Sequence, residues 1–311
     1  MKKVRHLVTV ADLTNDEIKL VYEVAAETKA QVKKGKRSQA LAGRILGMIF
    51  EKPSLRTRMS FQAAMIQAGG QAMDIRGSEI GLGKRESVKD IARVMSRYVD
   101  AIMIRTFEHR NVELLARHAT VPVINGLSDY VHPCQALSDV FTIREKLGSL
   151  KGVTLAFIGD GNNVARSLAA LCTKLGMNFV LSAPPGHEFE PSLTANLAKR
   201  LGRRLRVKVV RDPKKAIRDA QVVYTDVWVS MGQETEAEQR KRLFRPYQVN
   251  ARLMKHAPKD VLVMHCLPAH RGDEITDEVI DSPSSIVYDQ AENRLHAQKG
   301  LLFFLLGVEG L

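Results

Sequence analysis

The stretch ILGMIFEKPSLRTRMSFQAAMIQAGG, from Ile45 to Gly70, contains two hydrophobic patterns in succession. It begins with an apolar run of strand length, Ile45–Phe50, and a polar segment follows at once. After that segment, apolar residues recur at the i, i+3, i+4, i+7 spacing of an amphipathic helix, which a glycine pair closes: Phe61, Ala64, Met65 and Ala68. A buried strand that leads directly into a helix is the building unit of parallel α/β sheets.

The same alternation continues along the rest of the chain. The candidate strands are Ile45–Phe50, Ala101–Ile104, Val121–Ile124, Val153–Ile158, Phe179–Ser182, Val207–Val210, Val222–Thr225, Val261–His265 and Ile286–Tyr288. A short glycine-containing stretch at 147–152 is the predicted domain break. We therefore predict an α/β protein of two doubly wound parallel-sheet domains, with the active site in the crevice between them.

Composition narrows the class of protein. A chain of 311 residues with 45% hydrophobic and 26% charged residues is typical of a two-domain soluble protein. The net charge of +13 invites a nucleic-acid interpretation, but aromatics make up only 5% and none lies within the basic runs. We expect neither nucleic-acid nor membrane binding. The three widely spaced cysteines and the absence of a leader-like start favour the cytoplasm, and no metal-ligand spacing is present.

Ligands of open α/β sheets bind beyond the carboxyl ends of the strands, so the segments that follow the predicted strands locate the site. These segments are unusually polar: EKPSLRTR, RTFEH, NGLSDYVHPCQ, GDGNN, DVWVSMGQE and HCLPAHRG. In the first, Ser54 can cap a helix whose free N–H groups, with Arg56 and Arg58, form an anion site. A capped helix with exposed arginines is the alternative, although Arg105 at the end of another strand favours the anion site.

Three further segments carry competing interpretations. His132 and Gln135 open a helix and can polarise a carbonyl and hold an amide nitrogen, or can serve as an ordinary helix cap. Trp228 and Met231 can be core residues, although the spacing of Asp226 and Ser230 in the same segment favours a ligand-binding loop. The GDGNN segment suggests an NAD-dependent dehydrogenase, but Val164 stands at the third glycine position and no acid follows the next strand.

Taken in order, S-x-R-T-R, H-P-C-Q, G-D-G-N-N, D-V-W-V-S-M-G and H-C-L-P-A-H-R-G resemble the ornithine carbamoyltransferases over essentially the whole chain. The first two motifs are shared with the aspartate enzyme and concern carbamoyl phosphate only. The resemblance implies transfer of a carbamoyl group to the δ-amine of L-ornithine by direct amine attack, giving citrulline and phosphate without cofactor or metal. It also implies a homotrimer or a multiple of trimers. Residues 1–146 would bind carbamoyl phosphate, with 292–311 packing back onto them, and 151–291 would bind ornithine.

The resemblance also implies roles for individual residues. Carbamoyl phosphate would contact groups from several segments: Ser54, Leu55, Arg56, Thr57, Arg105, His132, Gln135, Cys266, Leu267 and Arg294. The catalytic residues among them would be Arg56, Thr57, Arg105, His132, Gln135 and Cys266. In ornithine binding, Asp226 would pair with the α-ammonium, while Ser230, the Met231 N–H and Asn163 would take the α-carboxylate. The carbonyls of Cys266 and Leu267, which precedes a cis bond, would lie by the δ-amine. No base is assigned to Cys266, which argues against a covalent nucleophile.

The chain departs from the commoner family pattern at two positions. Leu55 replaces a threonine whose contribution comes largely from the backbone. Gly81 stands where many members have a glutamine that reaches a neighbouring subunit's carbamoyl phosphate, so Lys84 or Arg85 is predicted to take that role. N-acylornithine and putrescine carbamoyltransferases are alternatives within the family, and the carboxylate-binding D-x-x-x-S-M-G pattern argues against both.

Overall fold

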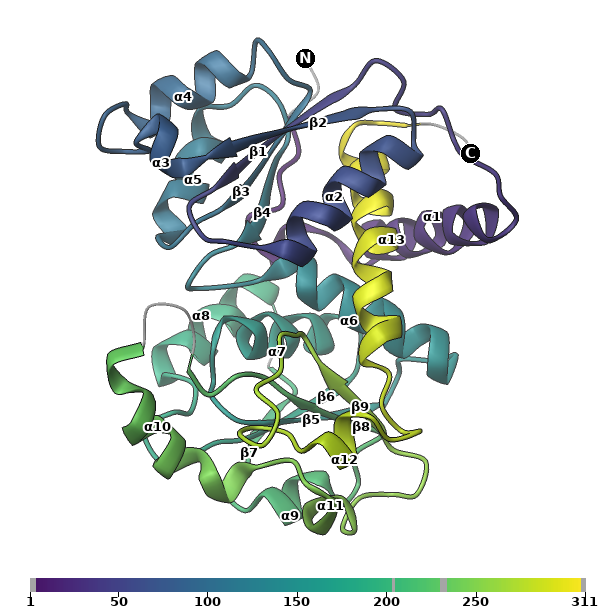
Figure 1. Ribbon diagram of the computed structural model, residues 1–311, viewed down its shortest axis with the longest axis vertical. Helices are drawn as coiled ribbons and strands as arrows, with labels where there is room; N and C mark the ends of the chain where they lie inside the picture. Colours follow the sequence, from purple (N-terminus) through teal and green to yellow (C-terminus); the bar gives the residue numbers. More distant parts are fainter. Residues whose placement is uncertain (1–3, 203–204, 230–233, 309–311) are drawn as a thin grey trace. The chain divides into compact units, whose positions relative to one another are not determined.

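The computed structural model describes residues 4–202, 205–229 and 234–308, and these residues form two compact units (Figure 1). The first unit extends to Phe141 and resumes at Glu292, and the second runs from Thr142 to Ala291. Both boundaries fall inside helices, α6 (Pro133–Leu147) and α13 (Val287–Leu305). The first unit is therefore built from two separate parts of the chain.

The first sheet has the strand order β2-β1-β3-β4, and every neighbouring pair is parallel. Its strands are β1 (Ile45–Phe50), β2 (Gln71–Arg76), β3 (Ala101–Arg105) and β4 (Val123–Leu127). Because β1 lies between β2 and β3, the order reverses between β1 and β3. Phe50 at the end of β1 pairs in register with Arg105 at the end of β3, so the loops that follow these strands begin side by side. Open α/β sheets bind their ligands at this reversal point.

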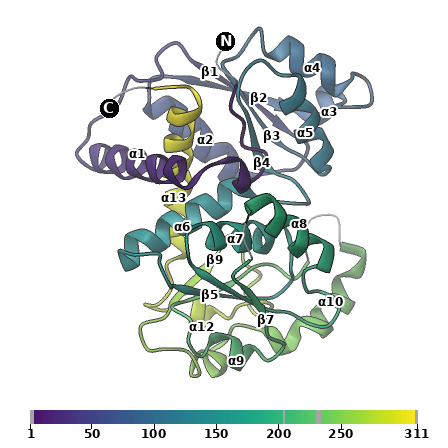
Figure 2. The ribbon, with the colours of Figure 1, turned by 180° about the vertical axis from the view of Figure 1, so that it is seen from behind.

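Helices cover both faces of this sheet. The helices of the unit, besides α6 and α13, are η1 (Val10–Asp12), α1 (Asn15–Lys33), α2 (Leu55–Gln67), α3 (Gly77–Ile80), α4 (Val88–Met95) and α5 (His109–His118). Figures 1 and 2 show α4 and α5 on one face and α1, α2 and α13 on the other. Gly47 lets α4 approach the sheet, because a Cβ there would lie 2.7 Å from the methyl carbon of Met95. Gly300 does the same for α13 on α1, where its Cβ would lie 2.3 Å from the Val21 carbonyl oxygen.

The second sheet has the order β7-β6-β5-β8-β9 and is also parallel throughout. Its strands are β5 (Thr154–Ile158), β6 (Asn178–Ser182), β7 (Val207–Val209), β8 (Val222–Thr225) and β9 (Leu262–His265). Here the order reverses between β5 and β8. Ile158, Thr225 and His265 are in register at the ends of β5, β8 and β9, so the three following loops share one edge of the sheet.

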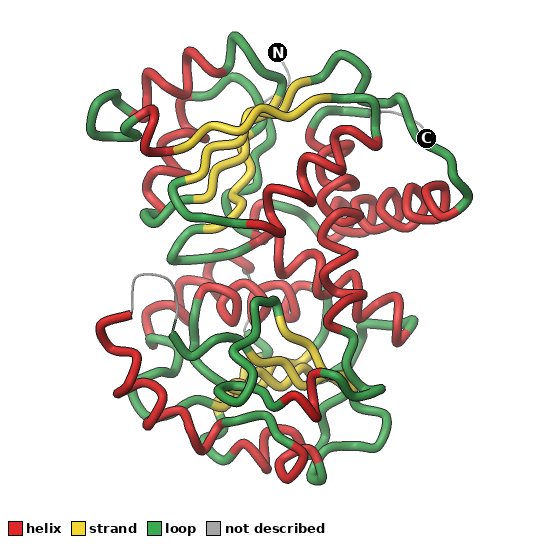
Figure 3. Tube along the Cα trace, in the orientation of Figure 1, coloured by secondary structure: helices red, strands yellow, loops and turns green. Residues whose placement is uncertain are grey.

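This sheet is likewise covered on both faces. Its helices are α7 (Asn163–Lys174), α8 (Pro191–Leu201), α9 (Pro213–Ile217), η2 (Glu234–Glu236), α10 (Ala237–Phe244), η3 (Arg245–Tyr247), α11 (Ala251–Met254) and α12 (Asp277–Ile280). Figures 1 and 2 show α7 and α8 on one side of the strands and α9 and α12 on the other, and Figure 3 shows helices in red on both sides of the yellow strands. Phe157 stacks between Phe179 and Tyr224, with ring centroids 6.2 and 5.2 Å away, which anchors three neighbouring strands to one another.

The structure confirms the α/β class with two parallel sheets and corrects two strand assignments. Ile286–Tyr288 was expected to be a strand, but Val287 begins α13 and only Ser285 forms a bridge, with Val263. Conversely, β2 has no counterpart among the predicted strands. It is the edge strand of the first sheet, and its Met73 is 54% exposed, so the sequence there lacks the buried apolar pattern of a strand.

Candidate functional site

The segment after β1 leads into the capped N-terminus of α2, where the sequence predicts an anion site. Ser54 is the N-cap of α2, and its hydroxyl accepts a hydrogen bond from the Thr57 N–H at 3.3 Å. Leu55 is 71% exposed and Arg56 is half-buried, so the side chain at position 55 is not held by the core. No acidic residue lies in the first turn of this helix, which leaves its dipole uncompensated by the chain itself.

Arg294 of α13 connects α2 to α6. It is buried, and it donates to the Thr57 hydroxyl at 3.0 Å through Nη2 and to the Gln135 amide oxygen through Nη1. In the orientation of the Gln298 amide that matches donors to acceptors, the Gln298 oxygen accepts from Arg294 Nε at 3.2 Å. Three residues predicted from separate motifs, Thr57, Gln135 and Arg294, therefore meet through one guanidinium.

His132 lies in the same cluster. Its pKa is held well below the usual 6.5, first by burial and then by the positive charges of Arg294, Arg105 and Arg56. The imidazole is therefore neutral near pH 7 and can donate only one hydrogen bond. Burial also raises the pKa of the Cys134 thiol to about 12, so this neighbouring cysteine is not a nucleophile.

A buried lysine links the loops that carry these groups. Lys52, in the loop after β1, forms an ion pair with Asp129 in the loop after β4. Its ammonium also lies 4.3 Å from the ring centroid of Phe107, in the loop after β3. Lys52 was not predicted from the sequence, because a lysine in a polar loop is usually exposed to solvent. Its two contacts connect the loop after β1 to the loops after β3 and β4.

In the second unit, Asp226 lies at the centre of a second cluster, directly after β8. One carboxylate oxygen accepts from the Val227 N–H and the Cys266 thiol, both at 2.8 Å, and the other accepts from the Asn162 amide at 2.8 Å. Asp226 is only 7% exposed, and these donors give its buried carboxylate oxygens hydrogen-bond partners. Asn162 also caps α7, with its oxygen 3.0 Å from the N–H groups of Val164 and Ala165.

The predicted ornithine residue Asn163 is the first residue of α7 and is half-buried. Its neighbour Asn162, which the sequence reasoning passed over, makes the contact to Asp226. The repeated asparagine of GDGNN was a signal for both positions, since either can cap a helix. The predicted residues Ser230 and Met231 lie outside the described residues.

The turn after β9 is held by a buried histidine. His265 Nδ1 accepts from the Leu267 N–H at 2.9 Å, and Nε2 lies 3.0 Å from Glu274, with both side chains fully buried. Leu267 has φ 55°, a left-handed conformation that costs a non-glycine residue energy, and the Leu267–Pro268 bond is cis, as the resemblance implies. Both ring nitrogens of His265 are thus engaged, and neither is available to deprotonate Cys266.

Among the described residues, one group of His, Cys, Asp and Glu is compact enough for a metal ion: Asp226, His265 and Cys266, with ligand atoms within 4.8 Å of one another. The bonds of His265 to Leu267 and Glu274 and of Cys266 to Asp226 already use these atoms. The group is therefore accounted for as a hydrogen-bonded cluster.

A second structural element supports the Asp226 loop. Arg240 of α10 is buried, donates to the Trp228 carbonyl at 2.6 Å through Nε, and forms an ion pair with Asp160 of the GDGNN segment. Its guanidinium also lies 5.1 Å from the Phe244 ring centroid. The lone tryptophan is 2% exposed, so Trp228 is indeed a core residue while its carbonyl ties the loop to Arg240.

The loop at 81–87 carries exposed Lys84 and Arg85. Gly81 ends α3 with φ 59°, and a Cβ there would lie 2.7 Å from the Arg85 Cβ. A glutamine at this position would therefore be strained and would displace Arg85. Lys84 and Arg85 do not contact the His132 cluster of this chain in any interaction that the structure shows among its described residues.

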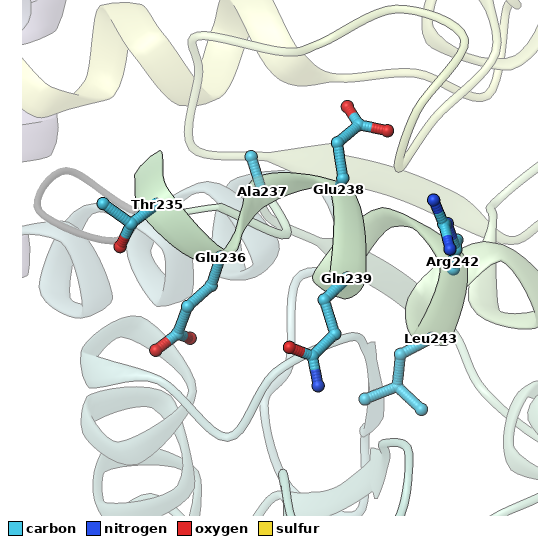
Figure 4. Close-up of a pocket in the computed structure, with 7 residues that line it drawn as sticks. All are labelled: Thr235, Glu236, Ala237, Glu238, Gln239, Arg242 and Leu243. Carbon is cyan, nitrogen blue, oxygen red and sulfur yellow. The ribbon is translucent and has the colours of Figure 1, made fainter.

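One surface pocket does not involve the residues of either cluster. Figure 4 shows an open pocket over η2 and α10, lined by Thr235, Glu236, Ala237, Glu238, Gln239, Arg242 and Leu243. These residues include none of the predicted site. Within the described ranges, every helix is too short or too polar to cross a lipid bilayer.

Two family descriptions match the chain, one on each side of the predicted domain break. Residues 5–145 match the aspartate/ornithine carbamoyltransferase carbamoyl-P binding domain, and residues 151–305 match the Asp/Orn binding domain of the same family. The parallel α/β fold, with its guanidinium cluster around a neutral histidine, is thus that of a carbamoyltransferase: the chain belongs to the aspartate/ornithine carbamoyltransferase family. This assignment replaces the dehydrogenase alternative.

Within the family, the similar proteins are ornithine enzymes. The chain is 52% identical over 307 residues to the anabolic ornithine carbamoyltransferase of Pyrococcus furiosus, covering 97% of this chain and 96% of that protein. It is 53% identical over 305 residues to the ornithine carbamoyltransferase of Methanopyrus kandleri, covering 97% of each. The solved ornithine carbamoyltransferase of Pyrococcus furiosus superposes with a TM-score of 0.93 at 51% identity and 98% coverage of both chains. That of Thermus thermophilus gives 0.86 at 39% identity, covering 98% of this chain and 100% of the other.

Proposed function

We propose that this chain is an ornithine carbamoyltransferase, which transfers the carbamoyl group of carbamoyl phosphate to the δ-amine of L-ornithine and releases L-citrulline and phosphate. The observation that carries the proposal is the pairing in one chain of a guanidinium cluster around neutral His132 with a buried, three-fold hydrogen-bonded Asp226. The first suits an acyl phosphate, and the second suits the ammonium of an amino acid. Full-length identity of about half to named ornithine carbamoyltransferases supports the same reaction.

The groups of the first unit act on the donor. The N-terminus of α2, with Ser54, Leu55, Arg56 and Thr57, holds the phosphate. Arg105, Thr57 and His132 donate to the carbonyl oxygen, Gln135 accepts from the carbamoyl nitrogen, and Arg294 reaches both α2 and Gln135. Amine attack forms the new C–N bond and places negative charge on the carbonyl oxygen, which preorganised donors stabilise. Collapse of the tetrahedral intermediate then breaks the bond to the phosphate, whose charge the arginines already balance.

The groups of the second unit choose and prepare the acceptor. Asp226 pairs with the α-ammonium of ornithine, and Asn163, Ser230 and the Met231 N–H take its α-carboxylate. The δ-amine must lose its proton before it attacks, because an ammonium has no lone pair. Carbonyls of Cys266 and Leu267 beside the amine accept hydrogen bonds from its N–H groups and so favour the neutral amine, whose proton passes to solvent before attack. The proton that the attacking nitrogen still has to lose leaves with the departing phosphate.

The assembly that we propose is a cytoplasmic homotrimer or a multiple of trimers. Free thiols at all three cysteines agree with a reducing compartment. In such a ring, Lys84 or Arg85 reaches the carbamoyl phosphate of the adjacent chain. Their exposure and the left-handed backbone at Gly81, which disfavours the usual glutamine there, support this assignment.

The function is tested by citrulline formation with four acceptors side by side: ornithine, putrescine, aspartate and N-acetylornithine. Ornithine should be used far better than the others, because only it offers both the ammonium and the carboxylate at the right distance from a free terminal amine. Asp226→Ala in the same assay should cost on the order of 2–5 kcal/mol in kcat/KM for ornithine, because it removes a desolvated charge pair. Equal turnover of ornithine and putrescine by the native enzyme would contradict the assignment, as would carbamoylation of aspartate.

A further inference from the structure

A buried carboxylate lies one helical turn beyond Gln135 and has no part in the reaction described above. Asp139 follows Gln135 by four residues on α6, so the two side chains share one face of the helix. Asp139 is fully buried and Gln135 is 2% exposed. Sequence reasoning did not select Asp139, because an acid four residues after a polar side chain is common on ordinary helices.

The two neighbours of Gln135 determine which way its amide points. The amide nitrogen donates to Asp139 Oδ1 at 2.8 Å, and the amide oxygen accepts from Arg294. A carboxylate can only accept hydrogen bonds and a guanidinium can only donate them. If the Gln135 amide were rotated by half a turn, its oxygen would face the Asp139 carboxylate and its –NH2 group would face the Arg294 guanidinium. Neither buried contact would then be a hydrogen bond, so only one amide orientation satisfies both neighbours.

This orientation matters for the donor substrate. The carbamoyl nitrogen of carbamoyl phosphate carries N–H groups and needs an acceptor, which the Gln135 oxygen is. That oxygen has two acceptor positions, so the carbamoyl group can bind beside Arg294 without displacing it. In acetyl phosphate a methyl group replaces the carbamoyl –NH2, while the phosphate and the carbonyl are unchanged. The contact to Gln135 is therefore what separates two otherwise matched acyl phosphates.

We propose that Asp139 is a positioning residue that locks the Gln135 amide with its oxygen toward the donor, and so sets the preference for carbamoyl phosphate over acetyl phosphate. The inference rests on the proposed function for the identity of the donor. Asp139 touches neither substrate. It acts by disfavouring the amide orientation in which the –NH2 group of Gln135 would face the –NH2 group of carbamoyl phosphate.

The test compares the dissociation constants of the two acyl phosphates, measured by calorimetry in the absence of ornithine. The native protein should bind carbamoyl phosphate more tightly than acetyl phosphate by about tenfold or more, the contribution of one hydrogen bond to a buried polar partner. The ratio that we compare is the dissociation constant of acetyl phosphate divided by that of carbamoyl phosphate. In Asp139→Leu, which offers Gln135 no acceptor, this ratio should fall about tenfold, mainly because carbamoyl phosphate binds more weakly. Asp139→Asn, the better-tolerated variant, should lower the ratio in the same direction by less, because its amide can present either end to Gln135.

Two controls separate positioning from a structural role. Gln135→Met removes the amide and should give the lowest ratio of all the variants. Adding Asp139→Leu to Gln135→Met should lower the ratio no further, because Asp139 acts only through Gln135. Asp100→Asn removes a carboxylate that pairs with Arg44 in the same unit and should leave the ratio at the native value. A ratio of two dissociation constants does not depend on the fraction of folded protein.

Native ratios in both Asp139 variants, or equal weakening of both ligands, would overturn the inference. The proposed function fails by a different result, which is native protein that makes no citrulline in the four-acceptor assay. Because the binding measurement uses no acceptor and no turnover, each proposal can fail while the other stands.

Discussion

Cys266 donates its thiol hydrogen to an Asp226 oxygen at 2.8 Å, and this direction decides what the sulfur can do. A nucleophilic cysteine needs a base or a nearby positive charge, and a carboxylate that accepts the thiol's hydrogen bond supplies no positive charge. His265, the adjacent residue, is committed to Leu267 and Glu274. In the proposed function, Cys266 therefore serves to orient the Asp226 carboxylate for the ornithine ammonium.

Replacing Cys266 by serine should keep most of the activity, since a hydroxyl can donate to the same oxygen. Cys266→Ala removes the donor and should raise KM for ornithine by about fivefold, the value of one hydrogen bond, with a smaller effect on kcat. Steady-state kinetics of the two variants make the comparison. A carbamoyl thioester trapped on Cys266 in the native enzyme would show this role to be wrong.

Motif order in the sequence was enough to find Thr57, His132, Gln135 and Asp226, which the structure places in two clusters. It did not find Asn162 or Asp139, because a hydrogen-bond partner is chosen by the folded geometry and not by spacing alone. The same holds for the glycine at position 81, whose φ of 59° is invisible in the sequence.

α13 packs against α1 and α2 through ionisable side chains as well as apolar ones. Lys299 is 1% exposed and donates to the Gln67 amide oxygen at 2.6 Å. Burial, with a smaller effect of Arg37, lowers the pKa of this lysine from 10.5 to about 8. Between these two values the folded chain releases the proton while the unfolded chain keeps it, so this group makes stability rise with pH from about 8 to 10.5.

Lys299→Met removes this titration. The difference in unfolding free energy between the native protein and the variant should change by on the order of 2–3 kcal/mol between pH 7 and 10.5, in favour of the native protein at high pH. Urea unfolding at several pH values measures it. The exposed Lys36→Met serves as the control and should differ from the native protein by a constant amount. If the difference in unfolding free energy between the native protein and Lys299→Met did not change with pH, the charged form of Lys299 would not be destabilised by burial.

Among the elements, strands with two buried faces were the easiest to predict from sequence. β1, β3, β5 and β8 are such strands, and their apolar runs mark them clearly. The edge strand β2 has exposed and half-buried residues only and was missed, and the apolar start of α13 at Val287 was taken for a strand. A short apolar run does not distinguish a strand from the first turn of a buried helix.

At the level of the whole molecule, the proposed trimer makes each active site depend on two chains. Arg105→Ala disables a chain's own site, whereas Lys84→Ala/Arg85→Ala disables the site of its neighbour. Each variant should be inactive alone. Mixed at equal amounts, they should recover about a quarter of the native activity, because every mixed ring of three contains one site with neither defect.

The recovery is measured by citrulline formation after the two variants are unfolded and refolded together, with mixed trimers verified by native mass spectrometry. Each variant refolded alone is the control. Confirmed mixed trimers without recovered activity would mean that the loop at 81–87 serves only its own chain.

The reversal of strand order within each sheet has a consequence for how new specificities can arise. The groups assigned to the donor follow β1, β3 and β4, while those assigned to the α-amino acid follow β5 and β8. Exchanging residues 226–236 can therefore alter the accepted amine without disturbing the bonds that fix Gln135 and Thr57. We therefore expect one donor-binding unit to work with different acceptor loops. A library confined to that loop is a direct route to enzymes that carbamoylate other amines.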